Sequence, residues 1–166
     1  MKVVFLDFDG VLNSLEFLQR EPGPLDRLDP VAIAHLNTIV QRSGAHVVIS
    51  SSWRLSRSSM ELRHLLEQLG FAGTIAGCTP DLSGAIRFAD YGFIRCSEIR
   101  AWLAQCVQPL EHFVVLDDAE LEEIEPNLVR TTFERGLMEE HVSAALQVLR
   151  SETPAESAGA ERSPSQ

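Results

Sequence analysis

The chain lacks the features that stabilise secreted proteins, span membranes or bind zinc. Its three cysteines are odd in number and form no C-x-x-C pair, which predicts reduced thiols and a cytoplasmic location. None of the five histidines forms an H-x-x-x-H pair, so no zinc motif is present. No apolar run approaches the roughly 20 residues of a membrane helix. The chain begins with strand-forming residues rather than a basic and apolar leader, so we expect neither secretion nor membrane insertion.

Basic residues are also scarce. The sequence has 14 Lys and Arg against 24 Asp and Glu, which gives a formal net charge of -10. Non-specific binding to nucleic acid depends on Lys and Arg that neutralise phosphates, so this balance argues against a broad nucleic-acid surface. A small basic patch at a cleft remains compatible with it. The sequence indicates no stable protein partner.

Short apolar runs alternate with amphipathic segments along the 166 residues, 45% of which are hydrophobic. This alternation predicts one α/β domain over residues 1–150, with a doubly wound, Rossmann-like, mainly parallel sheet and helices on both faces. The Ser-, Glu-, Ala- and Pro-rich residues 151–166 predict a disordered tail. We expect strands at 3–8, 46–49, 74–76, 112–116 and 128–131, helices at 30–42, 58–69, 97–106 and 138–150, and loops at 12–28 and 77–93.

Two aspartates, Asp7 and Asp9, stand at the end of the first apolar run, and Gly10 follows directly. Parallel strands present functional groups at their carboxyl ends, where open α/β sheets bind ligands. The two carboxylates have the same side-chain parity, so both would project into one site if the chain stays extended. Two buried carboxylates are costly without a cation or a proton between them. The pair therefore indicates chemistry rather than packing.

The segment Asp7-Phe8-Asp9-Gly10-Val11-Leu12 resembles the first motif of the haloacid dehalogenase (HAD) superfamily of phosphotransferases. The resemblance implies that Asp7 is the nucleophile, that it forms an aspartyl-phosphate, and that Asp9 is the general acid/base. It also implies that Gly10 lies beside the phosphate. Many HAD phosphatases have Thr where this chain has Val11, a frequent variation.

Val47-Val48-Ile49-Ser50 resembles the second HAD motif, which implies that the Ser50 hydroxyl binds the phosphoryl oxygens. Ser51 is the second candidate, because the register is open by one residue. A serine run that merely ends a strand and begins a loop is the structural alternative.

The third HAD motif is a Lys or Arg ahead of the last core strand. Arg95 lies at the start of the expected 97–106 helix and is favoured for this role. Its rival Arg54 follows Ser-Ser-Ser-Trp, and we expect it to contact the substrate. Arg87 and Arg100 are weaker candidates, and any of these arginines is more often a solvated surface residue.

Asp117 and Asp118 end the apolar run Val114-Val115-Leu116 and resemble the fourth motif. The resemblance implies that one or both of them hold a single Mg²⁺ together with Asp7 and the backbone carbonyl of Asp9. Mg²⁺ prefers oxygen ligands and keeps several waters, so this set suffices. Asp117 is favoured over Asp118, because it directly follows the strand.

Four segments also resemble the small HAD domains associated with Swiss Army Knife RNA repair proteins: 9–13, 50–54, 98–103 and 115–118. That resemblance implies a phosphatase that acts on nucleic-acid ends. The segments 12–28 and 71–94 are too short for a large cap domain. An uncapped site suits a bulky phosphorylated substrate, such as a polynucleotide end or a phosphoprotein.

The sequence therefore predicts a Mg²⁺-dependent phosphomonoester hydrolase without a large cap. One alternative is a small-molecule phosphatase or nucleotidase. Another is a catalytically silent HAD-fold module that binds Mg²⁺ and phosphate. The presence of both Asp7 and Asp9 argues against the silent module, and the acidic net charge argues against nucleic acid as substrate.

Overall fold

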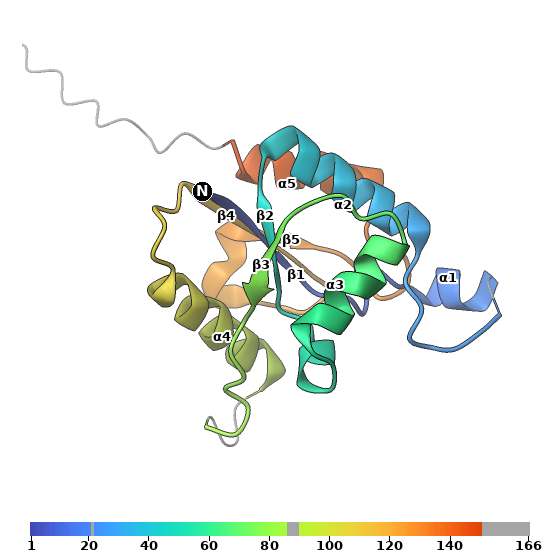
Figure 1. Cartoon of the computed structure of the whole chain (residues 1–166), viewed down its shortest axis with the longest axis horizontal. Helices are drawn as coiled ribbons and strands as arrows, with labels where there is room; N and C mark the ends of the chain where they lie inside the picture. The colour runs from blue at the N-terminus through green and yellow to red at the C-terminus, as the bar shows by residue number, and fades with distance from the viewer. Residues whose placement is uncertain (21, 86–89, 151–166) are drawn as a thin grey trace, which may run out of the picture.

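The computed structural model describes residues 1–20, 22–85 and 90–150, and within them a five-stranded sheet in the order β3-β2-β1-β4-β5 (Figure 1). All four neighbouring strand pairs are parallel. The chain starts in the centre, moves outward in one direction and then returns to fill the other side. This topology confirms the predicted doubly wound fold. The strands are β1 (Lys2–Leu6), β2 (His46–Ile49), β3 (Ile75–Cys78), β4 (His112–Asp117) and β5 (Leu128–Arg130).

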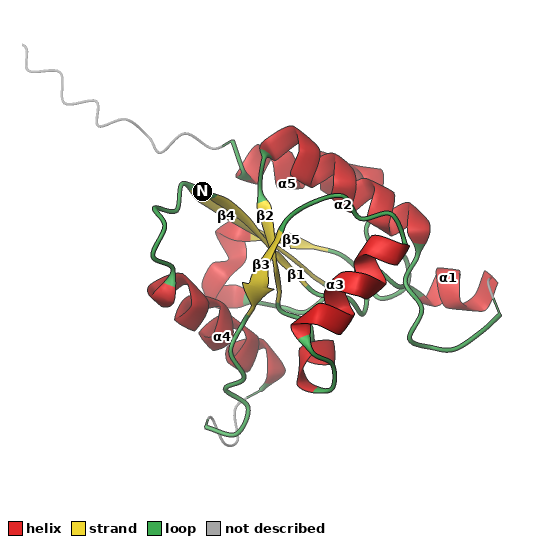
Figure 2. Cartoon of the chain, viewed as in Figure 1, coloured by secondary structure: helices red, strands yellow, loops and turns green. Residues whose placement is uncertain are grey.

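Helices cover both faces of the sheet (Figure 2). On one face lie α2 (Pro30–Ser43), α3 (Ser59–Gln68) and α5 (Glu139–Val148). On the other lie α4 (Tyr91–Gln105) and the 3-10 helix η2 (Glu122–Asn127). The short helix α1 (Leu15–Arg20) follows the first turn after β1, and the 3-10 helix η1 (Ser52–Leu55) follows β2.

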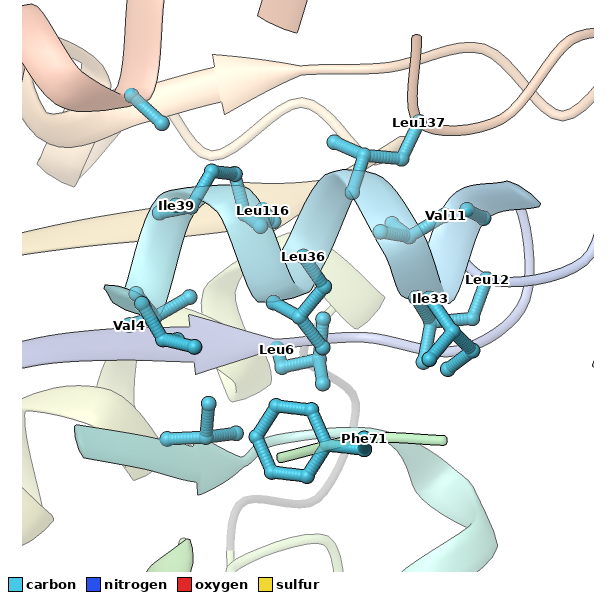
Figure 3. Close-up of a cluster of buried hydrophobic side chains, with 14 of the residues drawn as sticks. Val4, Leu6, Val11, Leu12, Ile33, Leu36, Ile39, Phe71, Leu116 and Leu137 are labelled. Atoms are coloured by element: carbon cyan, nitrogen blue, oxygen red, sulfur yellow. The ribbon is translucent and has the colours of Figure 1, made fainter. Parts of the chain in front are cut away.

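The parity of the β1 side chains divides the core into two layers. Val4 and Leu6 pack beneath α2, whose Leu36 lies above Leu6 (Figure 3). Val3 and Phe5 face α4 on the opposite side. Both layers are fully buried, and each such side chain contributes about 1.5–3 kcal/mol relative to an exposed one. This two-sided burial explains why β1 is a continuous apolar run in the sequence.

Capping contacts fix the ends of the helices. At the start of α2, the Asp29 side chain accepts a hydrogen bond from Val31 N at 2.8 Å. Gly44 ends the helix in the left-handed region with a φ of 72°. Ser58 and Glu61 form a capping box at the start of α3. These signals are local, which is why the sequence reveals them.

Several expected boundaries differ from the structure; the first strand, expected at 3–8, ends at Leu6, and three further differences bear on the helices and strands around the site. The helix expected at 97–106 begins at Tyr91, because Asp90 caps it by accepting a hydrogen bond from Phe93 N. Its first turn exposes Tyr91 and Phe93 and so has no amphipathic pattern. The connection 12–28 contains α1, which buries only Phe17. The strand expected at 74–76 lies instead at Ile75–Cys78.

Two further predictions fall on residues outside the described ranges: the tail at 151–166 and the weak candidate Arg87. Within the ranges described, no helix combines the length and apolar character needed to cross a lipid bilayer.

Candidate active site

A row of oxygen-bearing side chains lies along the carboxyl edge of the sheet, one from each strand. In spatial order the row is Thr79, Ser50, Asp7, Asp117 and Thr131, and all five are buried. Backbone hydrogen bonds of 2.9–3.0 Å hold neighbouring members in register across the sheet. Polar side chains therefore line the whole carboxyl edge, with Asp7 in the middle of the row.

Three carboxylates gather at the middle of this edge. Asp7, Asp117 and Asp118 each offer an oxygen, and these oxygens lie within 4.8 Å of one another. Asp9 does not belong to this cluster, because the chain turns at Phe8 instead of remaining extended. The side chains of Asp7 and Asp9 therefore do not point into one carboxylate cluster, as an extended chain would have placed them.

Arg95 is the cation that lies against this cluster. Its Nη1 donates to Asp117 Oδ2 at 2.6 Å and lies 3.5 Å from Asp7 Oδ2. The side chain is 1% exposed, and its guanidinium stacks over the Tyr91 ring at 4.8 Å from the ring centroid. Because α4 begins at Tyr91, Arg95 lies inside the helix and the Tyr91 ring packs against its guanidinium.

Burial and mutual repulsion disfavour the ionised carboxylates. The pKa of Asp117 is raised to about 7: desolvation is the largest cause, Arg95 opposes it, and nearby Asp7 adds to the rise. Desolvation and then Asp7 also raise the pKa of Asp118. A bound cation would stabilise the ionised forms of both groups.

A divalent cation fits this donor set. Carboxylate oxygens are the ligands that Mg²⁺ prefers, and three of them converge here. Asp117 and Asp118 both lie in the cluster, so both remain candidate ligands beside Asp7.

Two buried polar atoms next to Asp7 have no hydrogen-bond partner. Among the described residues, Ser50 Oγ, Thr79 Oγ1 and Arg95 Nη2 are the buried side-chain atoms left without one. A buried polar group without a partner costs about 1–3 kcal/mol, so such groups call for an explanation. An anion such as phosphate would accept hydrogen bonds from Ser50 and Arg95. Ser51 differs, because its Oγ accepts a hydrogen bond from Trp53 N at 3.4 Å and caps η1.

Asp9 lies beside the cluster and is hydrogen-bonded through both oxygens. Asn13 Nδ2 donates to Oδ1 at 2.9 Å, and Trp53 Nε1 donates to Oδ2 at 2.8 Å. Asp9 is half-buried, whereas Asp7 is buried. The two aspartates therefore present a buried and a more accessible carboxylate at the same edge.

Gly10 is required by its conformation and by its neighbour. Its φ is 73°, and a Cβ placed there would overlap the carboxylate of Asp118. Its carbonyl accepts a hydrogen bond of 2.6 Å from Thr131 Oγ1, and its N–H donates to Asn13 Oδ1 at 3.2 Å. The contact of Gly10 with phosphate stays a prediction, since this N–H already has a partner.

Arg54 has a role different from the expected contact with substrate. Its five N–H groups donate to the carbonyls of Ser50, Ser51, Thr79 and Pro80 and to Glu98 Oε2, the last at 2.5 Å. An arginine has five N–H donors, so none is left for a phosphate. Glu98 also accepts a hydrogen bond from Leu82 N at 3.1 Å. We name Arg54 and Glu98 the clamp, because they join α4 to the loops that follow β2 and β3.

Five residues that contribute to this edge are not among those that the sequence motifs predict. Thr79 and Thr131 carry a weak signal, a hydroxyl directly after a short strand. Glu98 lies one turn after Arg95 on a helix and is a charge among apolar neighbours. Asn13 and Trp53 stand inside segments that carry the family resemblance, but their bonds to Asp9 are tertiary contacts that no spacing reveals.

The fold and the edge residues together define an α/β domain of the HAD type. A model of the family described as the HAD domain in Swiss Army Knife RNA repair proteins matches residues 3–142, so the chain belongs to this family. No curated protein and no solved structure matches the chain. Membership confirms both resemblances and supports a phosphohydrolase class of enzyme. HAD proteins typically use Mg²⁺, which agrees with the carboxylate cluster.

Proposed function

We propose that this protein is a Mg²⁺-dependent phosphomonoester hydrolase that acts through an aspartyl-phosphate. An oxygen of Asp7 attacks phosphorus, and the bond between phosphorus and the leaving oxygen breaks. Asp9 donates its proton to that leaving oxygen as general acid. The alcohol departs and the phosphoryl group stays on Asp7.

The second step restores the enzyme. Asp9, now ionised, accepts a proton from a water molecule as that water attacks phosphorus. The bond between phosphorus and the Asp7 oxygen breaks, and inorganic phosphate leaves. Asp9 is protonated again and Asp7 is again a carboxylate, so both steps balance.

The transferring group carries negative charge that the site must stabilise. Ser50 Oγ and Arg95 Nη2 donate to its oxygens, and Asp117 holds Arg95 in place through the 2.6 Å contact. Asp7, Asp117 and Asp118 would hold Mg²⁺, which when bound neutralises charge on the phosphoryl oxygens.

The observation that carries this proposal is the pair of unpartnered buried donors, Ser50 Oγ and Arg95 Nη2, beside a carboxylate nucleophile. A purely structural site would satisfy both donors within the protein. A phosphoryl group supplies the acceptors that the described residues do not.

Hydrolysis of p-nitrophenyl phosphate across a Mg²⁺ titration tests the activity. We expect turnover that EDTA abolishes, and an acid-quenched phosphoryl label on the protein that hydroxylamine removes. Asp7→Asn should lose both while keeping its melting temperature, since it removes one of three clustered carboxylates. Turnover above a trace in Asp7→Asn would contradict the nucleophile. No turnover by the wild-type protein on any phosphate ester would favour the silent binding module.

For the substrate, we propose a phosphate at the end of a bulky molecule, such as a polynucleotide. The residues that would hold the phosphoryl group are buried, whereas Asp9 on the side of the leaving group is half-buried. The matched family is described as a domain of RNA repair proteins, which supports a nucleic-acid end as the substrate. The net charge of -10 opposes it. A small-molecule phosphatase or nucleotidase is the alternative, and comparison of matched substrates decides between them.

A further inference from the structure

The 3-10 helix η1 brings an indole N–H onto the carboxylate of Asp9. Trp53 Nε1 donates to Asp9 Oδ2 at 2.8 Å, across a sequence separation of 44 residues. Asn13 Nδ2 donates to the other oxygen at 2.9 Å. Two donors on two oxygens fix the plane of the carboxylate as well as its distance from β1.

Trp53 is itself held from several sides. Its ring meets Phe8 edge-on with centroids 5.3 Å apart, and the Arg57 guanidinium lies 4.6 Å from the centroid of the indole ring. Arg57 is anchored in turn by Asp26 at 2.8 Å. The Trp53 side chain is therefore a rigid support, since its body is packed and only its N–H is offered to Asp9.

Asn13 gives a weaker constraint than Trp53. It lies four residues from Asp9 in the same turn, so the two move with one backbone segment. Trp53 belongs to the segment that carries Ser50 and Ser51. The indole bond thus couples the proposed phosphate-binding loop to the proposed general acid.

We propose that Trp53 is a positioning residue that orients Asp9 toward the leaving oxygen. The inference rests on the proposed function, because it takes Asp9 as the general acid. A general acid must lie within hydrogen-bond reach of the oxygen that it protonates. A displacement of about 1 Å in such a group can cost about a hundredfold in rate.

The dependence of the rate on the leaving group distinguishes positioning from a general loss of structure. p-Nitrophenolate leaves easily without a proton, whereas an alkoxide needs one. Trp53→Phe keeps an aromatic ring and removes the N–H. We expect its kcat/KM on an alkyl phosphate such as glycerol phosphate to fall by at least about tenfold, and its kcat/KM on p-nitrophenyl phosphate to fall by less than about threefold.

Trp102→Phe is the matched control, because Trp102 packs against Phe5 on the α4 face of the sheet and lies away from Asp9. It should change both substrates alike. If Trp53→Phe does not fold, the isostere 3-benzothienylalanine at position 53 removes the N–H while keeping the shape of the ring. Both forms of the test compare kcat/KM at saturating Mg²⁺, because kcat/KM reports the steps up to loss of the leaving group, whereas the second step, in which Asp9 acts as a base, is the same for both substrates.

Equal losses on the two substrates, or no loss on either, would overturn the positioning role while leaving the phosphatase proposal intact. The phosphatase proposal fails separately, when the wild-type protein shows no Mg²⁺-dependent turnover. The two failures are therefore distinguishable within one set of assays.

Discussion

Neighbouring aspartates at the end of β4 make different contacts. Asp117 uses both oxygens, since Oδ2 accepts from Arg95 at 2.6 Å and Oδ1 accepts from Ala119 N at 3.0 Å. The Asp118 carboxylate lies over Gly10 and is half-buried. The strand-end argument favours Asp117 as the metal ligand, whereas these contacts favour Asp118.

We expect Asp118→Asn to raise the Mg²⁺ concentration for half-maximal activity by about tenfold, which corresponds to about 1.4 kcal/mol of lost binding. Its kcat at saturating Mg²⁺ should stay within a few-fold of the wild type. Asp117→Asn should lower kcat even at saturating Mg²⁺, because Arg95 loses its closest partner. Mg²⁺ titrations of both variants, with melting curves as the control for folding, measure the difference. A larger shift in the Mg²⁺ requirement for Asp117→Asn would restore the strand-end assignment.

At the scale of elements, α4 carries the two charges that organise the edge. Arg95 and Glu98 are three residues apart and so lie on one side of the helix. Arg95 meets the carboxylates, and Glu98 meets Arg54. The clamp therefore sets the loops after β2 and β3 relative to the helix that carries Arg95.

Removal of one partner of the clamp should be costly. Glu98→Gln leaves the buried Arg54 guanidinium without its counter-charge, and we expect it to lower the free energy of unfolding by about 3–5 kcal/mol. Arg100→Ala on the same helix is the control, because Arg100 pairs with Glu123 at the surface and should cost about 0–1 kcal/mol. Urea denaturation of the two variants gives the comparison. Equal costs would show that the clamp adds nothing beyond a surface pair.

His141, in the first turn of α5, should make the stability of the protein depend on pH. Met138 N donates to His141 Nδ1 at 2.9 Å, and burial lowers the pKa of His141 below its ordinary value of 6.5. The unfolded chain then binds a proton more readily than the folded one, so this contribution to stability is present above pH 6.5 and is lost as pH falls below it. His141→Gln keeps an acceptor at this position and removes the titration.

We therefore expect the melting temperature of the wild type to fall relative to that of His141→Gln between pH 7.5 and pH 5. Paired melting curves across this range measure the difference, and the same replacement at the exposed His64 is the control for the loss of an imidazole. A constant difference between wild type and His141→Gln would contradict the role of His141.

The elements that the sequence predicts well are those whose signals are local. β1, β2 and β4 are buried on both faces and so form apolar runs, and the positions that follow them are fixed once the strands are aligned. The bonds between Trp53 and Asp9 and between Arg54 and Glu98 join residues that are far apart in sequence. No periodicity encodes such contacts. The sequence alone therefore favours a substrate contact for Arg54, although its N–H donors all bond within the protein.

At the scale of the whole molecule, the site lies at one edge of a single sheet and has no large cap. Among the described residues, the connection after the first motif holds the short helix α1, and the connection after α3 holds β3. A substrate can therefore extend beyond its terminal phosphate. The Arg57 guanidinium packs on the ring of Trp53, which donates a hydrogen bond to Asp9, and the Arg57 side chain is 32% exposed. Among the described arginines, Arg57 is therefore the one that we expect to contact such an extension.

A phosphorylated oligonucleotide should therefore give a higher kcat/KM than the matching mononucleotide, because contacts remote from phosphorus can stabilise the transition state. Arg57→Ala should cost more on the oligonucleotide than on p-nitrophenyl phosphate, and added salt should weaken only the oligonucleotide reaction. Arg42→Ala, in the last turn of α2, is the control for the loss of one positive charge. The acidic net charge of -10 makes this comparison decisive, since a global attraction to nucleic acid is absent and any preference must come from local contacts. Equal or better efficiency on mononucleotides or sugar phosphates would instead favour the small-molecule phosphatase.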